Sequence, residues 1–378
     1  MKLLVIPSWY PSKSYSNSGI FFKEQAEAFS KNNCEVTVLS IEIPYRKTKK
    51  DYKYFVKNVS NENGLCVYRY VFPVGILHRF PKCYYKFLKI ISTLIYKKEL
   101  EKQNFDAIHA HSFIIGGYIG VCLKKKYGLK CVITEHTSRI LKKNLKAVEL
   151  GVLKQCLLES DEFVCVSENL KKNVIDLTKS DKKIKVYPNM VSNIFEYQKK
   201  AAEPFLFVSV GNLQYEKRMD LVIKGFCKAF TKEDPVFLTI VGQGTEYNTL
   251  KALIEENKRQ NQIKLTGALE REKVAELLQK SNVMALVSEK ETFGIVYIEG
   301  LASGNVIIGA HNGGADDIIN EKNGIFISEF TDESVSQAMK MVFQNYKEYN
   351  LEQISNSGKR TYGEEAFANY YLRLLMGK

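Results

Sequence analysis

Short apolar runs alternate with segments of helical length along almost the whole chain, and this alternation limits the possible folds more than any other feature. In the first half the runs predict strands at 2–6, 35–39, 65–71, 106–110, 130–134, 162–166 and 184–187. In the second half they predict strands at 205–210, 236–241, 263–266, 283–287, 305–309 and 324–327. Apolar strands that alternate with helices are typical of parallel sheets covered on both faces. The sequence therefore predicts an α/β protein with two doubly wound, Rossmann-like domains.

The alternation is interrupted once, by a polar stretch between Pro188 and Pro204. We therefore expect a first domain at 1–190, a linker at 191–204 and a second domain at 205–360. Residues 361–378 have a helical pattern and are expected to pack back on the first domain. Ligands of open parallel sheets bind beyond the carboxyl ends of the strands, so we expect a site that faces a central cleft between the domains.

Composition narrows the class of protein and its compartment. The 378 residues are 45% hydrophobic, which is enough for two cores, but no apolar stretch has the length that spans a bilayer. Residues 1–6 enter a strand-like run that is too short for a signal-peptide core, so we expect a cytoplasmic protein. The eight cysteines form no C-x-x-C pair, which argues against a zinc site.

Positive charge is concentrated in the first half of the chain. Residues 1–190 hold 33 Lys and Arg against 17 Asp and Glu, a net charge of +16, whereas residues 191–378 hold 22 against 25, a net charge of −3. This asymmetry suggests different partners for the two halves. Because the excess is not confined to one tail, we do not expect a nucleic-acid-binding arm.

Two carboxylates bracket the segment from Glu291 to Glu299, which follows the strand at 283–287 and runs into a helix expected at 298–302. One acid would lie on the loop and the other about two turns further on. The amides of Phe293, Gly294 and Ile295 lie between them, near a helix N-terminus that favours an anion. The arrangement suits a hydroxylated ligand with a diphosphate. The alternative is a solvated helix with two surface acids.

A second candidate site follows the strand at 205–210. That strand ends at Gly211 and Asn212, and the loop after it presents Lys217 and Arg218 at the start of a helix. These cations could hold a diphosphate, or they could be an ordinary solvated helix start. The sequence has no Asp-x-Asp motif to hold a catalytic magnesium ion, so we expect neither a metal nor a cofactor.

The two sites are accompanied by further motifs in a fixed order along the chain. These are Ser8–Pro11, Ser18–Gln25, Ile108–His111, Val132–His136, Tyr187–Met190, Val210–Leu213 with Glu216 and Lys217, Ile240–Gly244, Gly267 and Gly313–Gly314. Together they resemble glycosyltransferase family 4, whose members are retaining enzymes of the GT-B fold. The resemblance covers nearly the whole chain.

The resemblance implies roles for the residues of the second domain. Glu291 would contact the hydroxyls of the donor sugar, Glu299 the nucleotide ribose, and Lys217 the diphosphate. Two positions depart from the family pattern. The basic residue usual after the glycine is Asn212 here, and the glycine usual after the lysine is Arg218. The resemblance leaves open whether Arg218 partly replaces the missing cation.

In the first domain the resemblance places His136 near the sugar, where it would help to align donor and acceptor. The alternative is a strand-end histidine that caps the backbone. His111 is a weaker candidate than His136, on the acceptor side. Gly19 resembles the glycine that lets the first loop approach donor phosphate, although this region could be a plain helix start capped by Asn17 or Ser18. The remaining histidines are expected to be structural, with His109 facing the sheet interior: His78, His109 and His311.

The segment 79–98 predicts a basic amphipathic helix. Its apolar residues, at 80, 84, 87, 88, 91, 94 and 95, have helical spacing, whereas Lys82, Lys86, Lys89 and Lys97 lie largely elsewhere on the helix. Such a helix can lie on an anionic membrane surface, or it can bury its apolar stripe against the sheet. We expect peripheral contact with the inner face of the cell membrane on this acceptor side.

The sequence thus predicts a metal-independent, retaining glycosyltransferase that moves a sugar from a UDP- or GDP-sugar to a growing, lipid-linked glycan of a cell-surface polysaccharide. Three other interpretations stay open. A nucleotide-sugar epimerase could use the same fold, and a non-catalytic protein could bind the donor without turnover. A NAD-dependent dehydrogenase is disfavoured because no G-x-G-x-x-G follows the first strand.

Overall fold

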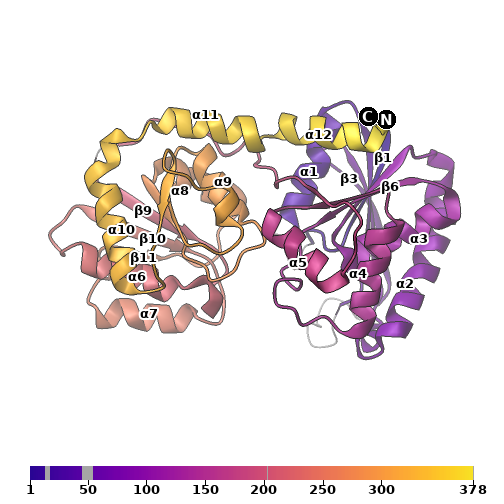
Figure 1. Cartoon of the computed structure of the whole chain (residues 1–378), viewed down its shortest axis with the longest axis horizontal. Coiled ribbons are helices and arrows are strands. Elements are labelled where there is room, and N and C mark those ends of the chain that lie inside the picture. Colours follow the sequence, from indigo (N-terminus) through magenta and orange to yellow (C-terminus); the bar gives the residue numbers. More distant parts are fainter. Residues whose placement is uncertain (13–17, 45–53, 202, 378) are drawn as a thin grey trace. The chain divides into compact units, whose positions relative to one another are not determined.

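The computed structural model describes residues 1–12, 18–44, 54–201 and 203–377. The chain forms two compact units (Figure 1). Unit 1 contains Met1–Pro188 together with Glu364–Lys378, and unit 2 contains Asn189–Gly363. Each unit is built on its own sheet, and both are α/β units dominated by parallel strands.

Unit 1 holds an eight-stranded sheet in the order β3-β4-β2-β1-β5-β6-β7-β8. Every neighbouring pair is parallel except β3 with β4, as the apolar runs predict. The strands are β1 Lys2–Pro7, β2 Glu35–Glu42, β3 Val56–Glu62, β4 Leu65–Val71, β5 Ala107–His111, β6 Lys130–Glu135, β7 Glu162–Cys165 and β8 Lys185–Val186.

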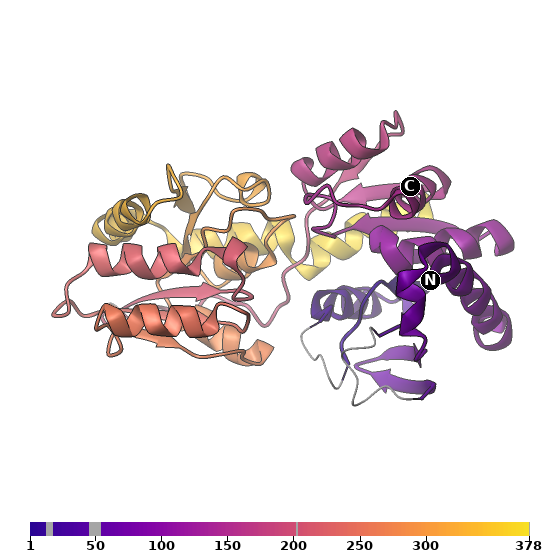
Figure 2. The same cartoon turned by 90° about the horizontal axis from the view of Figure 1, so that it is seen from below.

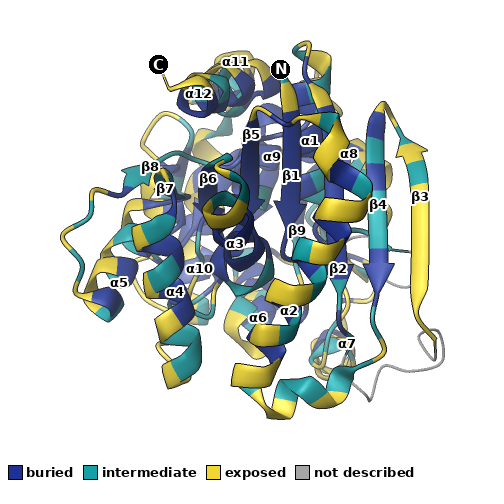
Figure 3. Ribbon diagram, turned by 90° about the vertical axis from the view of Figure 1, so that its right-hand side faces the viewer, coloured by how far each residue is buried: buried dark blue, intermediate teal, exposed yellow. Residues whose placement is uncertain are grey.

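The edge strand β3 is present in the structure but was not among the strands expected from the sequence. Its sequence, VKNVSNE, contains few apolar residues, and most of its positions are exposed (Figure 3). It pairs in antiparallel register with β4 alone. An edge strand that buries neither face needs no apolar run, so its pairing cannot be read from hydrophobicity.

The helices of unit 1 fall into two groups. α2, α3 and α4 contact one another, and α1 contacts α12. The core lies between these helices and the sheet, whose central strands are almost fully buried (Figure 3). The helices are α1 Ile20–Lys31, α2 Pro81–Ile95, α3 Tyr118–Tyr127, α4 Ala147–Glu159, α5 Glu168–Thr178 and α12 Glu364–Met376.

The C-terminal helix α12 belongs to unit 1 although the preceding helix, α11, belongs to unit 2. Phe367 and Tyr371 of α12 are buried, and the Phe367 ring centroid lies 5.4 Å from that of Phe29 on α1. Glu364 pairs with Lys31 of α1 at 2.7 Å. Aromatic burial therefore fixes α12 on unit 1, with one ion pair at its start.

Unit 2 holds a six-stranded, fully parallel sheet in the order β11-β10-β9-β12-β13-β14. α6 contacts α7 and α10, whereas α9 contacts α8 and α11, which gives two groups of helices (Figure 2). The strands are β9 Phe205–Val210, β10 Val236–Val241, β11 Ile263–Leu265, β12 Val283–Ala285, β13 Val306–Gly309 and β14 Gly324–Phe326. The helices are α6 Met219–Ala229, α7 Tyr247–Glu256, α8 Arg271–Lys280, α9 Ile295–Ala302, α10 Asp332–Asn345 and α11 Leu351–Tyr362.

The segment expected as a linker, 191–204, clusters with unit 2 in the structure. Phe195 is fully buried there. Lys200 Nζ donates hydrogen bonds to the carbonyls of Leu278, Gln279 and Ser281 at the end of α8, at 3.1, 3.2 and 2.5 Å. Burial lowers the pKa of Lys200 to about 7. Cations are favoured at a helix C-terminus, so this polar segment is anchored on unit 2.

Candidate active site

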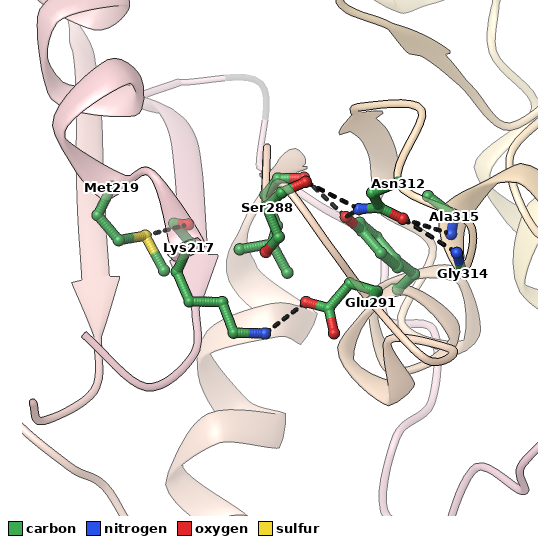
Figure 4. A network of polar contacts seen from close by, with 10 residues as sticks. Lys217, Met219, Ser288, Glu291, Asn312, Gly314 and Ala315 are labelled. Atoms are coloured by element: carbon green, nitrogen blue, oxygen red, sulfur yellow. Dashed lines mark hydrogen bonds and ion pairs between the residues drawn. The ribbon is translucent and has the colours of Figure 1, made fainter. Parts of the chain in front are cut away.

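Three neighbouring strands of unit 2 place their following loops at one edge of the sheet. β9 pairs with β12, and β12 pairs with β13, all in parallel. Their carboxyl ends therefore meet at the same edge. The loops supply Lys217, Glu291 and Asn312, respectively (Figure 4). This is the edge at which open parallel sheets bind ligands.

Lys217 and Glu291 form an ion pair between Lys217 Nζ and Glu291 Oε1 (Figure 4). Both side chains are largely buried. The Glu291 backbone N–H also donates to the Asn312 carbonyl at 3.2 Å, which fixes the loop that carries the acid. The structure thus brings together the residues expected to hold the sugar and the diphosphate.

Asn312 is a structural centre of this edge that the sequence did not single out. Its Nδ2 donates to the Ser288 carbonyl and to the Tyr297 hydroxyl, each at 3.2 Å. Its Oδ1 accepts from the backbone N–H groups of Gly314 and Ala315 at 3.1 and 2.9 Å (Figure 4). One buried amide side chain thus joins the loops after β12 and β13. The only signal in the sequence was its place before the Gly313–Gly314 pair.

Helix α9 begins at Ile295, three residues earlier than expected. Its N-cap, Gly294, has φ 85°, and a Cβ there would lie 2.5 Å from Tyr297 Cδ2, so only glycine fits. The first N–H groups of a helix have no partner within the helix. Because the Phe293 side chain is buried, it is the backbone of Phe293–Ile295 that can meet an anion close to Glu291.

Glu299 lies inside unit 2 and not on its surface. Its residue exposure is 3%, and its Oε1 accepts from Arg271 Nη1 at 2.5 Å. The Arg271 guanidinium lies 4.8 Å from the centroid of the Phe195 ring. The interpretation of two surface acids on a solvated helix is therefore wrong for Glu299. Nothing in the sequence marks Arg271 or Phe195 as its neighbours.

Arg218 is already neutralised by two carboxylates. Its guanidinium donates to Asp220 at 3.2 and 3.3 Å and to Glu289 at 3.1 Å. Hydrogen bonding to Asp220, followed by the bond to Glu289, raises the pKa of Arg218 above its ordinary value. Asn212 is exposed on the same loop, beside the half-buried Gly211. That Arg218 replaces the cation absent at Asn212 stays a prediction, since a ligand would compete with two acids.

Unit 1 presents two histidines at the ends of adjacent strands. His111 ends β5 and His136 follows β6, and the two strands pair in parallel. His111 Nδ1 lies 3.3 Å from His136 Nε2, within hydrogen-bond distance, and both residues are buried. Burial, followed by the neighbouring His109 and His136, lowers the pKa of His111 well below its ordinary value. His111 is therefore a neutral imidazole at physiological pH.

Glu135 shapes the turn that carries His136. Its carboxylate accepts from the backbone N–H groups of Phe113, His136 and Thr137 at 2.8, 2.9 and 2.8 Å. Complete burial raises the pKa of Glu135 to about 7, although these bonds favour the ionised form. The sequence assigned it no role of its own. It holds the strand end in place.

Gly19 begins α1 beside the two histidines. It has φ 73°, and a Cβ there would lie 2.6 Å from the Trp9 carbonyl oxygen, so the position requires glycine. Phe22 on the same helix places its ring centroid 4.6 Å from His111 and 5.0 Å from His136. Gly19 is the N-cap and no side chain caps α1, so Ser18 does not act as expected, and Asn17 lies outside the described residues.

The other histidines make structural contacts. His109 is buried and its Nε2 lies 2.8 Å from Thr134 Oγ1, in the sheet interior as expected. Burial lowers the pKa of His109 to about 3. His78 Nε2 lies 2.7 Å from the Ile43 carbonyl. His311 is largely exposed and pairs with Asp316.

Helix α2 divides its apolar residues between two faces, which corrects the single stripe expected from the sequence. Tyr84, Leu88 and Ile95 are buried, as in an ordinary domain helix. In contrast, Ile90 and Leu94 are 51% and 47% exposed, and Phe80 just before the helix is 57% exposed. The lysines expected on the acceptor side are exposed too: Lys82, Lys86 and Lys89. In the described part of the chain, no helix combines the length and the apolarity needed to cross a membrane.

Comparisons with known proteins identify the family. Residues 18–193 match the sequence profile of "Glycosyltransferase Family 4", and residues 191–360 match that of "Glycosyl transferases group 1". The chain belongs to glycosyltransferase family 4. The predicted family and the predicted GT-B fold are thereby confirmed, and the protein is an enzyme of the glycosyltransferase class.

Relatives of this family 4 glycosyltransferase have varied names. It is 25% identical over 345 residues to the N-acetyl-alpha-D-glucosaminyl L-malate synthase of Bacillus anthracis, covering 88% of this chain and 85% of that protein. It is 24% identical over 253 residues to the alpha-monoglucosyldiacylglycerol synthase of Streptococcus pneumoniae, covering 59% and 56%. Anabaena Alr3699/HepE, solved in complex with UDP-glucose, matches with a TM-score of 0.74 at 14% identity over the full length of both chains.

Proposed function

We propose that this glycosyltransferase moves a sugar from a UDP- or GDP-sugar to a growing, lipid-linked glycan in the synthesis of a cell-surface polysaccharide. It retains the anomeric configuration and requires no metal. The observation that carries the proposal is the Lys217–Glu291 pair, which lies at the ligand-binding edge of unit 2 close to the start of α9. A cation, a carboxylate and a helix N-terminus together match the diphosphate and the hydroxyls of such a donor.

Each part of the donor has a partner in this proposal. Glu291 accepts hydrogen bonds from sugar hydroxyls, and Glu299 accepts them from the ribose. Lys217 and the amides of Phe293–Ile295 bind the diphosphate oxygens. The Anabaena protein solved with UDP-glucose supports a nucleotide sugar as the ligand. No residue described above distinguishes uracil from guanine, so the proposal covers both bases.

The chemical step follows from these positions. The bond between the anomeric carbon and the diphosphate oxygen breaks, and the acceptor oxygen bonds to that carbon from the same face. The proton of the acceptor hydroxyl passes to the departing diphosphate. Lys217 and the α9 amides offset the charge that develops on the leaving group, which is the task of a metal in other transferases. The His136 imidazole orients the reacting hydroxyl.

An assay with a panel of UDP- and GDP-sugars, with and without a lipid-linked glycan acceptor, tests the reaction. We expect the nucleoside diphosphate to be released and the sugar to appear on the acceptor with its anomeric configuration unchanged, in the presence of a chelator. Conversion of the donor to an epimer without acceptor would assign the protein to the epimerases. Donor binding without any turnover would make it a binding protein.

We propose further that the α2 face is the membrane-contacting surface of the enzyme. Phe80, Ile90 and Leu94 are exposed at helical spacing, and three exposed lysines (Lys82, Lys86 and Lys89) flank them along the helix. Apolar groups inserted at the lipid boundary and lysines near anionic headgroups are what holds a helix on such a surface. The net charge of +16 in residues 1–190 has the matching sign.

Vesicle co-sedimentation tests this surface. Each lysine near an anionic surface contributes about 1 kcal/mol, so replacing Lys82, Lys86 and Lys89 by Gln should weaken binding to phosphatidylglycerol vesicles on the order of 100-fold. A matched control replaces three exposed lysines of α5 and the turn after it by Gln: Lys172, Lys179 and Lys183. If both triple variants bind equally well, α2 is not the contact surface.

A further inference from the structure

The position of Glu299 is costly unless another group offsets its charge. It is the fifth residue of the eight-residue helix α9, and its residue exposure is only 3%. A buried carboxylate that lacks a partner is strongly disfavoured. The C-terminal half of a helix also favours cations over anions. The fold must therefore supply a cation that holds this side chain in one place.

Arg271 supplies that cation. It is the first residue of α8, and α8 contacts α9. Arg271 Nη1 donates to Glu299 Oε1 at 2.5 Å, and the two side chains are only 17% and 4% exposed. Charge-assisted bonds of this kind are short and directional. The position of the guanidinium therefore fixes the position of the carboxylate.

Phe195 in turn supports the guanidinium. Its ring is fully buried, and its centroid lies 4.8 Å from Arg271 Cζ. A guanidinium held against an aromatic face gains cation–π stabilisation and loses rotational freedom. Arg271 thus has an aromatic ring to pack on and a carboxylate to donate to. The Phe195 ring belongs to the segment 191–204. This segment therefore contributes to the site through its contact with Arg271.

The arrangement leaves half of the Glu299 carboxylate for a ligand. Oε1 is taken by Arg271, whereas Oε2 accepts no hydrogen bond from any described residue. A carboxylate oxygen has lone pairs for hydroxyl donors. We propose that Arg271 is the positioning residue that directs Glu299 Oε2 at the ribose hydroxyls of the donor, and that this sets a preference for ribose over deoxyribose. The proposal rests on the proposed function, because it takes Glu299 as the ribose contact.

The preference has a physical cause. A site built to accept from a hydroxyl penalises a ligand that lacks it, because the buried acceptor is left without a donor. If Arg271 is removed, the Glu299 side chain is free to turn, and a ribose hydroxyl then gains little from it. A purely structural ion pair predicts something different: lower stability of unit 2 with an unchanged ratio of ribose to deoxyribose affinity.

Calorimetry on the full chain separates these possibilities. The ligands are UDP and GDP with their 2′-deoxy and 3′-deoxy counterparts, and the variants are Arg271→Gln and Arg271→Lys. We expect the wild type to prefer the ribose form of the nucleotide that binds by on the order of 10-fold. Arg271→Gln should weaken the ribose form and leave at least one deoxy form almost unchanged, so that the preference is lost. Arg271→Lys keeps the charge but lacks the planar guanidinium. Its preference for the ribose form should therefore lie between that of the wild type and that of Arg271→Gln.

The control is Lys273→Gln, which removes one charge from the same helix at an exposed residue paired with Glu276. It should change neither the affinity nor the preference. An unchanged ratio in Arg271→Gln would overturn the proposal. If Arg271→Gln does not fold, an unchanged ratio of ribose to deoxyribose affinity in Arg271→Lys would overturn the proposal instead. If the wild type binds neither UDP nor GDP, the proposed function itself fails. If it binds but ignores the deoxy change, the role of Arg271 fails while donor binding stands.

Discussion

The candidate site residues of unit 2 and those of unit 1 differ in charge and in the way their side chains are held in place. In unit 2 the key groups are charged and compensated: Glu291 pairs with Lys217, and Glu299 pairs with Arg271. In unit 1 the key groups are imidazoles packed against aromatic rings. His111 lies against Phe22, and burial lowers its pKa well below the ordinary value. One region is rich in ion pairs, whereas in the other a neutral His111 is buried against an aromatic ring.

This difference teaches what each region can bind. Ion pairs at a binding edge can be exchanged, because an anionic ligand that reaches Lys217 replaces the Glu291 carboxylate and frees it for a hydroxyl. A neutral imidazole in a desolvated place cannot compensate a charge, but it can orient a hydroxyl group. Unit 2 is therefore suited to the diphosphate sugar, and unit 1 to the uncharged reacting groups.

The largest effect is expected from Glu291→Gln. The amide cannot accept hydroxyl hydrogen bonds as a carboxylate does, so the rate of transfer should fall by at least about 100-fold. Free UDP or GDP should nevertheless bind several-fold more tightly, because Lys217 no longer has a carboxylate partner. Steady-state kinetics and calorimetry measure the two quantities on the same sample.

Glu289→Gln is the matched control, since Glu289 lies on the same loop and pairs with Arg218. It should leave the transfer rate within a few-fold of the wild type. Weaker nucleotide binding by Glu291→Gln would show that the ligand does not replace Glu291 as the partner of Lys217. The proposed difference between the two units would then be wrong.

The sequence predicted the central strands of both sheets well, because a buried parallel strand must be apolar on both faces. It also predicted that Lys217 and Glu291 follow strands of one sheet. Their direct pairing depends on β9 lying beside β12, which the chain order alone does not determine. The edge strand β3 and the second apolar face of α2 were missed for a related reason. Both concern exposed surface, where the apolar pattern carries little information.

The partners of the site residues were not predictable. From the sequence alone, Arg271 cannot be told from any other cation at the start of a helix. Phe195 lies in a segment whose polar composition suggests a linker. Only the packing of α8 on α9 brings them to Glu299. Asn312 could not be predicted for the same reason, because two of its side-chain hydrogen bonds reach Ser288 and Tyr297, which are 24 and 15 residues away in the sequence.

A smaller effect is expected in unit 1. His136→Ala removes a hydrogen-bonding imidazole, so transfer should fall about 10- to 100-fold, less than in Glu291→Gln. The affinity for free UDP or GDP should not change, because the residues assigned to the nucleotide belong to unit 2. His78→Gln is the control, since it removes an imidazole whose Nε2 lies 2.7 Å from the Ile43 carbonyl oxygen. A drop in nucleotide affinity in His136→Ala would place the imidazole on the charged part of the donor.

The smallest effect concerns stability and tests whether the buried histidine His109 of unit 1 is uncharged in the folded state. His109 lies beside Thr134, His111 and Tyr371, and burial lowers its pKa from 6.5 to about 3. As the pH falls below 6.5 the unfolded chain takes up this proton first, so stability present above pH 6.5 is lost progressively down to about pH 3. Between pH 7 and pH 5 the loss from His109 is about 2 kcal/mol.

Glu135 acts with the opposite sign, because its pKa is raised to about 7, and a folded state that binds the proton more readily gains stability as the pH falls. The wild type alone can therefore conceal both contributions. Urea unfolding of the wild type and of His109→Phe at pH 7 and pH 5 isolates the histidine, since Glu135 is present in both proteins. The free energy of unfolding of the wild type should fall by about 2 kcal/mol relative to the variant. Parallel behaviour of the two proteins would mean that His109 is charged in the folded state, and the contrast between charged site residues in unit 2 and neutral imidazoles in unit 1 would then not hold for His109.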